Sequence, residues 1–160
     1  MKKPPGMGNN PTGVVFILSV SPIDEDCVSL ERIFTDSDWT AYTNSKWALI
    51  VRSTVASAVV AIRQYPFPIV LCEADLLPDT WREMLEQISM LPEPPLLIVT
   101  SRLADERLWA EALNLGAHDV LAKPFDRREV FRILSMAWLH WKDQSEFHTK
   151  AASLMVAASA

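Results

Sequence analysis

Glycine and cysteine are scarce in this chain: four of its 160 residues are Gly and two are Cys. It has no Gly-rich loop of the kind that wraps phosphate groups, and no G-x-S-x-G or H-E-x-x-H motif. Cys27 and Cys72 lack metal-ligand and redox spacing, so we expect reduced, buried thiols. His118, His140 and His148 show no ligand spacing either, so these residue types predict no metal site.

Positive charge and long apolar stretches are also scarce. Fifteen Lys and Arg stand against 20 Asp and Glu, which gives a formal net charge of −5. Nucleic-acid-binding domains usually carry a basic surface, so nucleic acid is not an expected partner. The longest apolar run, Val14–Val20 with Ser19 as its one polar residue, is far shorter than a membrane span. Residues 4–13 are too polar for a secretory signal, so we expect a cytoplasmic protein without membrane contact.

What the chain does contain is an alternation of short apolar strands and amphipathic helices. Strands are expected at Val14–Val20, Trp47–Val51, Ile69–Cys72, Leu96–Val99 and Asp119–Ala122. Helices are expected to begin near Ser21, Ser53 or Thr54, Pro78–Thr80, Asp105 and Arg127, the last running to at least Trp141. Such alternation predicts an α/β fold with a doubly wound, five-stranded parallel sheet and helices on both faces. We divide the chain into a disordered lead-in (1–12), one domain (13–141) and a C-terminal helical extension or tail (142–160).

The first helix and the segment after it are the least regular part of this pattern. Ser21 is expected to cap the helix and Pro22 to take its first position, while Asp24–Asp26 favour the positive end of the helix dipole. A helical face is formed by Ile23, Cys27, Leu30 and Phe34. Thr35–Lys46 is predicted to be a loop, with an extra strand around Trp39–Thr43.

Polar side chains follow three of the expected strands, where sites lie in sheets of this kind. Glu73 follows the third strand, Thr100 the fourth and Lys123 the fifth. A lysine as point charge and a threonine as donor can bind a phosphoryl group. A structural ion pair between Glu73 and Lys123 explains the same residues.

Two segments carry a more specific signal. Ile98–Ser101 reads Ile-Val-Thr-Ser, and Leu115–Phe125 reads Leu-Gly-Ala-His-Asp-Val-Leu-Ala-Lys-Pro-Phe. This combination at this spacing resembles the second half of a response-regulator receiver domain, and the resemblance covers roughly residues 14–141. It implies a flavodoxin-like fold with strand order 2-1-3-4-5. It also implies that Thr100 is the phosphoryl-sensing hydroxyl, that Lys123 is the family's invariant lysine, and that the peptide bond before Pro124 is cis.

The family's metal site is absent from the expected position. Receiver domains hold Mg²⁺ through an acidic pair after the first strand, and that position reads Ser21-Pro22 here. Neither residue supplies a carboxylate, which Mg²⁺ prefers, so we expect no cofactor and a lost Mg²⁺ site.

The acceptor and the switch residue also depart from the family. The phosphoacceptor position is Glu73 or Ala74; we prefer Glu73, because it ends the apolar strand, and Asp75 is the alternative acceptor. Glu73 then either imitates a phosphorylated aspartate or neutralises Lys123. Val120 stands where the family has an aromatic switch residue.

These features predict an atypical stand-alone receiver domain that signals by binding a protein partner and is neither phosphorylated nor an enzyme. The expected partner face lies on the last two helices and the strand between them, with Trp109, Val120, Trp138 and Trp141. A homodimer through this face, and through a tail stripe formed by Phe147, Ala151 and Leu154, is expected.

Two alternatives remain open. The first is a phosphorylatable receiver that uses Asp75 as acceptor and Asp24 or Glu25 as shifted metal ligands. The second is a flavodoxin-like enzyme or nucleotide binder, which the missing phosphate loop makes the weaker reading.

Overall fold

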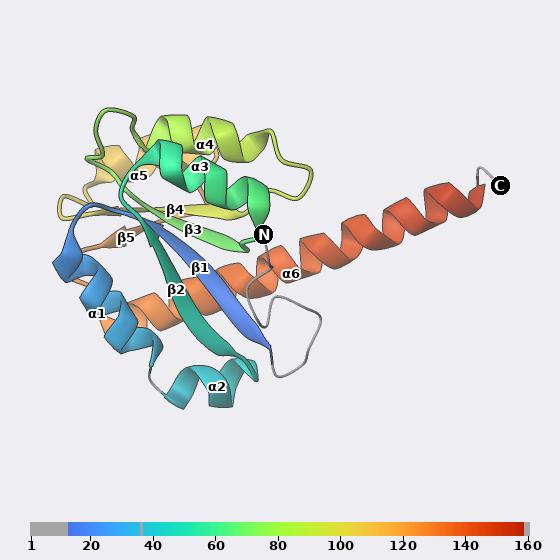
Figure 1. Cartoon of the computed structure of the whole chain (residues 1–160), viewed down its shortest axis with the longest axis horizontal. Coiled ribbons are helices and arrows are strands. Elements are labelled where there is room, and N and C mark those ends of the chain that lie inside the picture. The colour runs from blue at the N-terminus through green and yellow to red at the C-terminus, as the bar shows by residue number, and fades with distance from the viewer. Residues whose placement is uncertain (1–12, 36, 159–160) are drawn as a thin grey trace.

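A computed structural model of the chain describes residues 13–35 and 37–158. Within these ranges the chain forms a five-stranded parallel sheet in the order β2-β1-β3-β4-β5, with helices around it (Figure 1). The predicted flavodoxin-like α/β fold is therefore confirmed. The expected disordered lead-in, residues 1–12, lies outside the described residues.

The strands lie where the apolar runs predict them, because strands covered on both faces need continuous apolar sequence. They are β1 (Val14–Val20), β2 (Lys46–Arg52), β3 (Ile69–Glu73), β4 (Leu96–Ser101) and β5 (Asp119–Ala122). The helices are α1 (Asp24–Phe34), α2 (Ser37–Thr43), α3 (Val55–Gln64), α4 (Trp81–Ser89), α5 (Glu106–Leu115) and α6 (Arg127–Ala158).

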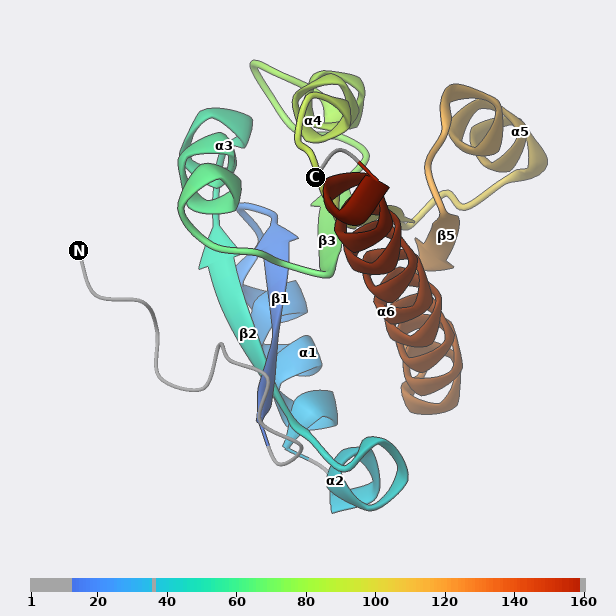
Figure 2. The same cartoon turned by 90° about the vertical axis from the view of Figure 1, so that its right-hand side faces the viewer.

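The helices cover the two faces of the sheet and enclose two separate cores. Helices α3, α4 and α5 pack on one face, around Val20, Val70 and Val99. Helices α1, α2 and α6 lie on the other face, around Ile17 and Ile69 (Figure 2). Alternate residues of each strand therefore point to different cores, which decides the face on which each strand-end side chain lies.

Local signals at several helix ends are confirmed. Thr54 caps α3 and Thr80 caps α4, each within a reciprocal capping box. Gly116 ends α5 in the left-handed conformation, with φ of 109°, as a glycine at this position allows.

The prediction for the start of α1 is wrong. The helix begins at Asp24, two residues later than Pro22, and the Ser21 hydroxyl accepts a hydrogen bond from the backbone N–H of Ile23 at 3.2 Å. The buried face also differs from the predicted one: it consists of Asp26, Leu30, Ile33 and Phe34. Cys27 is only half-buried.

The expected extra strand at Trp39–Thr43 is also wrong, because this segment belongs to the short helix α2. Trp39 is 2% exposed, and its ring packs edge-on against Phe34, with 5.3 Å between ring centroids, and tilted against Trp47, at 4.5 Å. Its indole N–H donates to the carbonyl of Ile33 at 2.8 Å. Burial of this ring between α1 and β2 outweighs the strand preference of the local sequence.

Helix α6 is continuous from Arg127 to Ala158, so the expected extension continues the last helix as far as residue 158. Its first turns pack on the sheet, whereas its C-terminal part projects away from the domain (Figure 1). Among the described residues, no helix is both long enough and apolar enough to cross a membrane.

Candidate functional site

Three strand-end side chains meet at the carboxyl edge of the sheet. Leu71 and Leu121 belong to the core beneath α1 and α6. Glu73 ends β3 and Lys123 directly follows β5, each two residues beyond its leucine, so both lie on the same side of the sheet. Thr100 is the register partner of Glu73 in the β3–β4 pair. Strand alternation alone therefore brings the three predicted site residues together.

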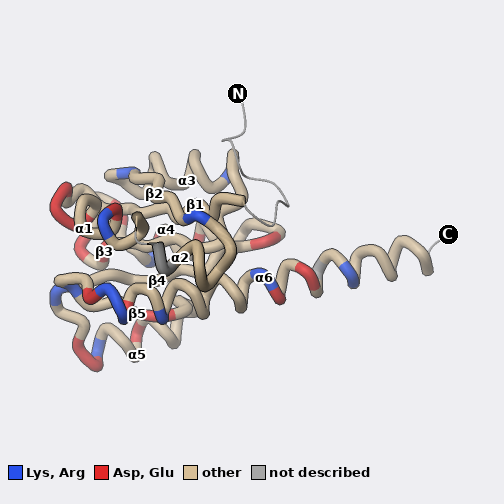
Figure 3. The backbone as a smooth tube through the Cα atoms, turned by 90° about the horizontal axis from the view of Figure 1, so that it is seen from below, with Lys and Arg blue, Asp and Glu red and all other residues tan. Residues whose placement is uncertain are grey.

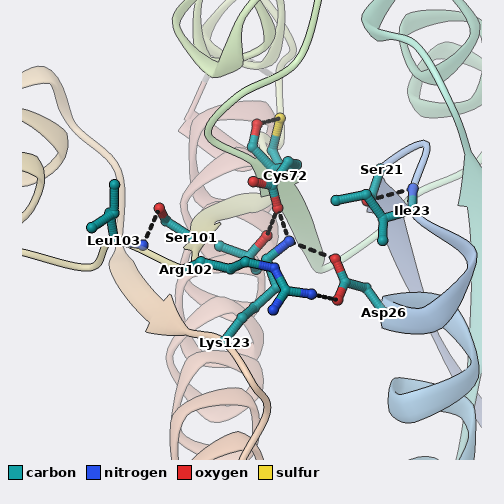
Figure 4. A network of polar contacts seen from close by, with 10 residues as sticks. Ser21, Ile23, Asp26, Cys72, Ser101, Arg102, Leu103 and Lys123 are labelled. Atoms are coloured by element: carbon teal, nitrogen blue, oxygen red, sulfur yellow. Dashed lines mark hydrogen bonds and ion pairs between the residues drawn. The ribbon is translucent and has the colours of Figure 1, made fainter.

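Lys123 is the centre of this cluster. Its side chain is 1% exposed, and its Nζ donates to Asp26 Oδ2 at 2.5 Å and forms a second ion pair with Glu73 Oε2 (Figure 4). Both carboxylates are nearly as buried, with 10% and 5% of their side-chain surface exposed. The predicted pairing of Glu73 with Lys123 is present, and the ammonium bridges two carboxylates from different elements.

Asp26 is the site residue that the sequence interpretation missed, since it was assigned to the helix dipole. The signal was available: Asp26, Leu30 and Ile33 repeat at i, i+4 and i+7, which places Asp26 on the buried face of α1. Arg102, which follows β4, adds a weaker outer contact, its guanidinium lying 4.0 Å from Asp26 Oδ1. With Arg102 included, two positive charges balance two negative ones.

The hydroxyl of Thr100 completes the network. Thr100 Oγ1 donates to Glu73 Oε2 at 3.3 Å, so the same carboxylate oxygen receives the hydroxyl and the ammonium. In the described part of the chain, every buried side-chain nitrogen or oxygen atom has a hydrogen-bond partner. The donors that could bind an incoming anion are thus already engaged within the protein.

The thiol of Cys72 lies directly beside this network, on the opposite face of β3. Burial, together with the neighbouring charge of Glu73, raises the pKa of Cys72 to about 12. The thiol is therefore neutral and behaves as part of the apolar core.

The residues of the alternative site lie elsewhere. Asp75, Asp24 and Glu25 are exposed, and the ion pairs of Lys123 go to Asp26 and Glu73 instead. Across residues 13–35 and 37–158, no three His, Cys, Asp or Glu side chains gather as a metal ion would require.

Two features near the site concern the backbone. The Lys123–Pro124 peptide bond is cis, as the resemblance implies, and so is Leu77–Pro78. At the position where receiver domains carry an acidic pair, Pro22 is exposed and Ser21 makes the turn contact with Ile23 described above.

The expected partner face is formed by α5, β5 and α6, and one of its assigned members does not belong there. Trp109 is 38% exposed on α5, and Trp138 and Trp141 are half-buried on α6. Val120 is 1% exposed and packs in the core beneath α3, α4 and α5. Because side chains alternate between the two faces of a strand, its position in β5 directs it into this core. Its assignment to the partner face is therefore wrong.

Solved structures of receiver domains share this fold. The chain is similar to the receiver domain of an HD-domain-containing protein from Pseudomonas fluorescens, with 21% identity and a TM-score of 0.70 over 82% of this chain and 92% of that one. It is also similar to a CheY-like receiver domain from Methanospirillum hungatei, with 16% identity and a TM-score of 0.67 over 82% and 99%.

A third similar structure is the receiver domain of a sensor histidine kinase from Pseudomonas aeruginosa, which has a magnesium ion coordinated in its active-site cleft. Its identity is 19% and its TM-score 0.63, over 79% of this chain and 98% of that one. No family model matches the chain, and no curated protein matches it in sequence. At these identities the similarity establishes the fold: the chain has the fold of a response-regulator receiver domain.

Proposed function

We propose that this chain is an atypical receiver domain in signal transduction, which binds a protein partner and has exchanged phosphorylation chemistry for a permanent internal ion-pair network. The similarity to receiver domains supports the signalling role. The loss of phosphorylation chemistry is supported by one observation: the buried ammonium of Lys123 forms ion pairs with both Asp26 and Glu73.

The residues at this edge do not fit Mg²⁺. This ion requires near-octahedral oxygen ligands at short distances, usually including one or two carboxylates. Asp26 and Glu73 are the buried carboxylates here, and both contact the Lys123 ammonium. A cation placed between them would have to displace that ammonium, and Ser21 and Pro22 offer no replacement carboxylate. We therefore infer that the protein works without a metal ion.

Glu73 supports a constitutive state of the site. In this fold the resemblance assigns Thr100 and Lys123 to the contacts of a phosphorylated acceptor, and here both residues contact Glu73. The Glu73 carboxylate thus binds the Thr100 hydroxyl and the Lys123 ammonium, the two groups that would otherwise contact a phosphoryl group. Val120 stands at the position of the family's aromatic switch residue, so no aromatic ring at this position can change its orientation between two states.

The proposed output is protein binding through the surface formed by α5, β5 and α6. Trp109 supplies an exposed aromatic side chain there, and exposed tryptophans are frequent anchors of protein interfaces. This role requires no catalytic group, so the module is not an enzyme.

The test is phosphorylation in vitro. The full chain is incubated with Mg²⁺ and acetyl phosphate and examined by intact-mass spectrometry, alongside a phosphorylatable receiver domain as positive control. We expect an unchanged mass, because neither a free acidic pair nor an aspartate acceptor lies at the site. Titration with Mg²⁺ and a beryllofluoride mimic should leave the amide NMR spectrum unchanged.

A stoichiometric phosphoryl adduct would overturn the proposal. The variant Asp75→Asn then separates the alternatives: loss of the adduct would assign the acceptor role to Asp75, and its persistence would assign it to another residue.

A further inference from the structure

The C-terminal part of α6, residues 142–158, leaves the domain as a helical arm (Figures 1 and 2). Before the arm, Val130 and Ala137 are completely buried against the sheet. In the arm, Phe147 is 71% and Leu154 64% exposed. In proteins, most of the stability of a helix comes from the packing of an apolar face. A contact that covers these apolar side chains would stabilise the arm.

Several apolar residues and one aspartate share one side of α6. We call it the outer stripe; its members are Met136, Asp143, Phe147, Ala151, Leu154 and Ala158, and all except the half-buried Ala151 are exposed. They recur at intervals of three, four or seven residues, so they share one side of the helix, about a quarter-turn from the side that Val130 and Ala137 bury. The outer stripe begins beside the domain, where Met136 is 63% exposed, and runs the length of the arm.

Charges on the arm distinguish possible partners for this stripe. Acidic and basic residues both occur along the arm (Figure 3). Asp143 lies on the outer stripe and Lys150 at its edge, seven residues apart, and within the described residues neither forms an ion pair. A parallel second copy brings Asp143 against Asp143 and gives neither charge an opposite partner. An antiparallel copy with its two-fold axis beside Phe147 places Asp143 opposite Lys150 of the second copy, and Lys150 opposite its Asp143.

The same antiparallel register matches the apolar residues. It brings Leu139, 47% exposed, opposite Leu154 of the second copy, and it brings the two Phe147 rings together near the axis. One helix pair then forms two ion pairs and two leucine contacts by symmetry, which is the pattern of an isologous interface.

The length of the outer stripe limits the size of the contact. Residues 136–158 span about 34 Å of helix at 1.5 Å per residue. A specific interface should bury about 1,000 Å² or more in total, which requires each copy to cover roughly 500 Å² of this surface. Association at micromolar concentration, dependent on concentration, is the expected strength.

We propose that the chain forms an antiparallel homodimer through the outer stripe of α6, with Asp143 and Lys150 as reciprocal ion pairs about an axis beside Phe147. The contact is independent of the chemistry at the Lys123 site, so failure of one proposal leaves the other standing.

Sedimentation velocity of the full chain over a micromolar concentration series tests the proposal. We expect dimers for the wild type, and mostly monomers for Asp143→Lys and for Lys150→Asp, because each single change places like charges opposite one another. The double variant Asp143→Lys/Lys150→Asp restores opposite charges and should restore the dimer. Thr149→Lys adds a charge on another side of the helix and serves as the matched control, which should remain dimeric.

Disulfide crosslinking in a Cys27→Ser background tests the orientation. Phe147→Cys lies beside the proposed axis and should crosslink to itself on oxidation. Leu154→Cys should not crosslink to itself, but should crosslink to Leu139→Cys when the two variants are mixed.

Three results would overturn the proposal. A monomer at every concentration would show that another protein or nothing covers the outer stripe. A dimer insensitive to both single charge changes would place the interface elsewhere, for example on α5 and β5. Equal self-crosslinking of Phe147→Cys and Leu154→Cys would show a parallel pair.

Discussion

Replacing Lys123 should destabilise the fold more than replacing either of the carboxylates that it binds. In the variant Lys123→Met, the buried carboxylates of Asp26 and Glu73 both lose their positive partner, and they lie near each other with like charge. In Glu73→Gln, by contrast, the ammonium keeps its contact with Asp26. The bridging geometry therefore predicts an asymmetry that an isolated ion pair would not show.

The magnitudes follow from the burial of the three groups. Removing one partner of a buried ion pair costs about 3–5 kcal/mol, and we expect Lys123→Met to fall in this range. Glu73→Gln or Asp26→Asn removes one of two charged contacts, which is worth about 1.5–3 kcal/mol. The triple variant Asp26→Asn/Glu73→Gln/Lys123→Met leaves no buried charge without a partner among these three positions. It should therefore be more stable than Lys123→Met alone.

Urea unfolding followed by tryptophan fluorescence provides the measurement, since Trp39, Trp47 and Trp81 are buried in the native state. Glu111→Gln is the control, because it removes an ion pair with Arg82 whose side chains are 37% and 46% exposed. Such an exposed pair contributes at most about 1 kcal/mol. Equal destabilisation by Glu73→Gln and Lys123→Met, or strictly additive costs in the triple variant, would refute the bridging role of Lys123.

Two further outcomes concern groups outside the site. Burial and the ring of His140, stacked at 5.5 Å, lower the pKa of His118, so the unfolded chain takes up a proton that the folded chain resists. Stability should therefore fall as pH drops below about 6.5, and His118→Gln should weaken this dependence in pH-resolved thermal unfolding. Burial also raises the pKa values of both thiols; a disulfide reagent should modify the half-buried Cys27 slowly and Cys72 only after denaturation, and rapid modification of Cys72 in the native protein would contradict its assigned burial.

The sequence was sufficient to predict the strands of the sheet, because each strand is a mostly apolar run that polar or turn-forming residues separate from its neighbours. In a sheet covered on both faces, a strand must be apolar along its whole length to be buried. The apolar sequence that marks a strand locally is therefore also the sequence that packing in the fold requires. The same agreement holds at the Thr54 and Thr80 caps and at Gly116, where the required chemistry is local. The sequence pattern therefore predicts that Glu73, Thr100 and Lys123 meet at one edge of the sheet.

The sequence was insufficient where a contact with another element determines the local structure or the role of a residue. Trp39 lies in a segment of strand-favouring residues, yet its ring packs against Phe34 and Trp47, and the segment becomes α2. The helix periodicity could place Asp26 on the buried face of α1, but its partner, Lys123, lies 97 residues later, so the sequence did not show the contact. The predicted face of α1 shares Leu30 and Phe34 with the observed one, but it has Ile23 and Cys27 in place of Asp26 and Ile33.

In the proposed mode of action the site has no exchangeable ligand, which changes how such a module can be regulated. The Lys123 network links α1, β3, β4 and β5 through contacts made entirely by the chain itself, so its state does not vary with a phosphoryl group or a cation in the proposed mode of action. Any variable input must then act on association, either with a partner at the α5–β5–α6 surface or with a second copy along the α6 arm. Association through the arm follows mass action, so the fraction of dimer depends on protein concentration and on competition for the outer stripe. In that arrangement the amount of protein present determines how much of the binding surface is occupied.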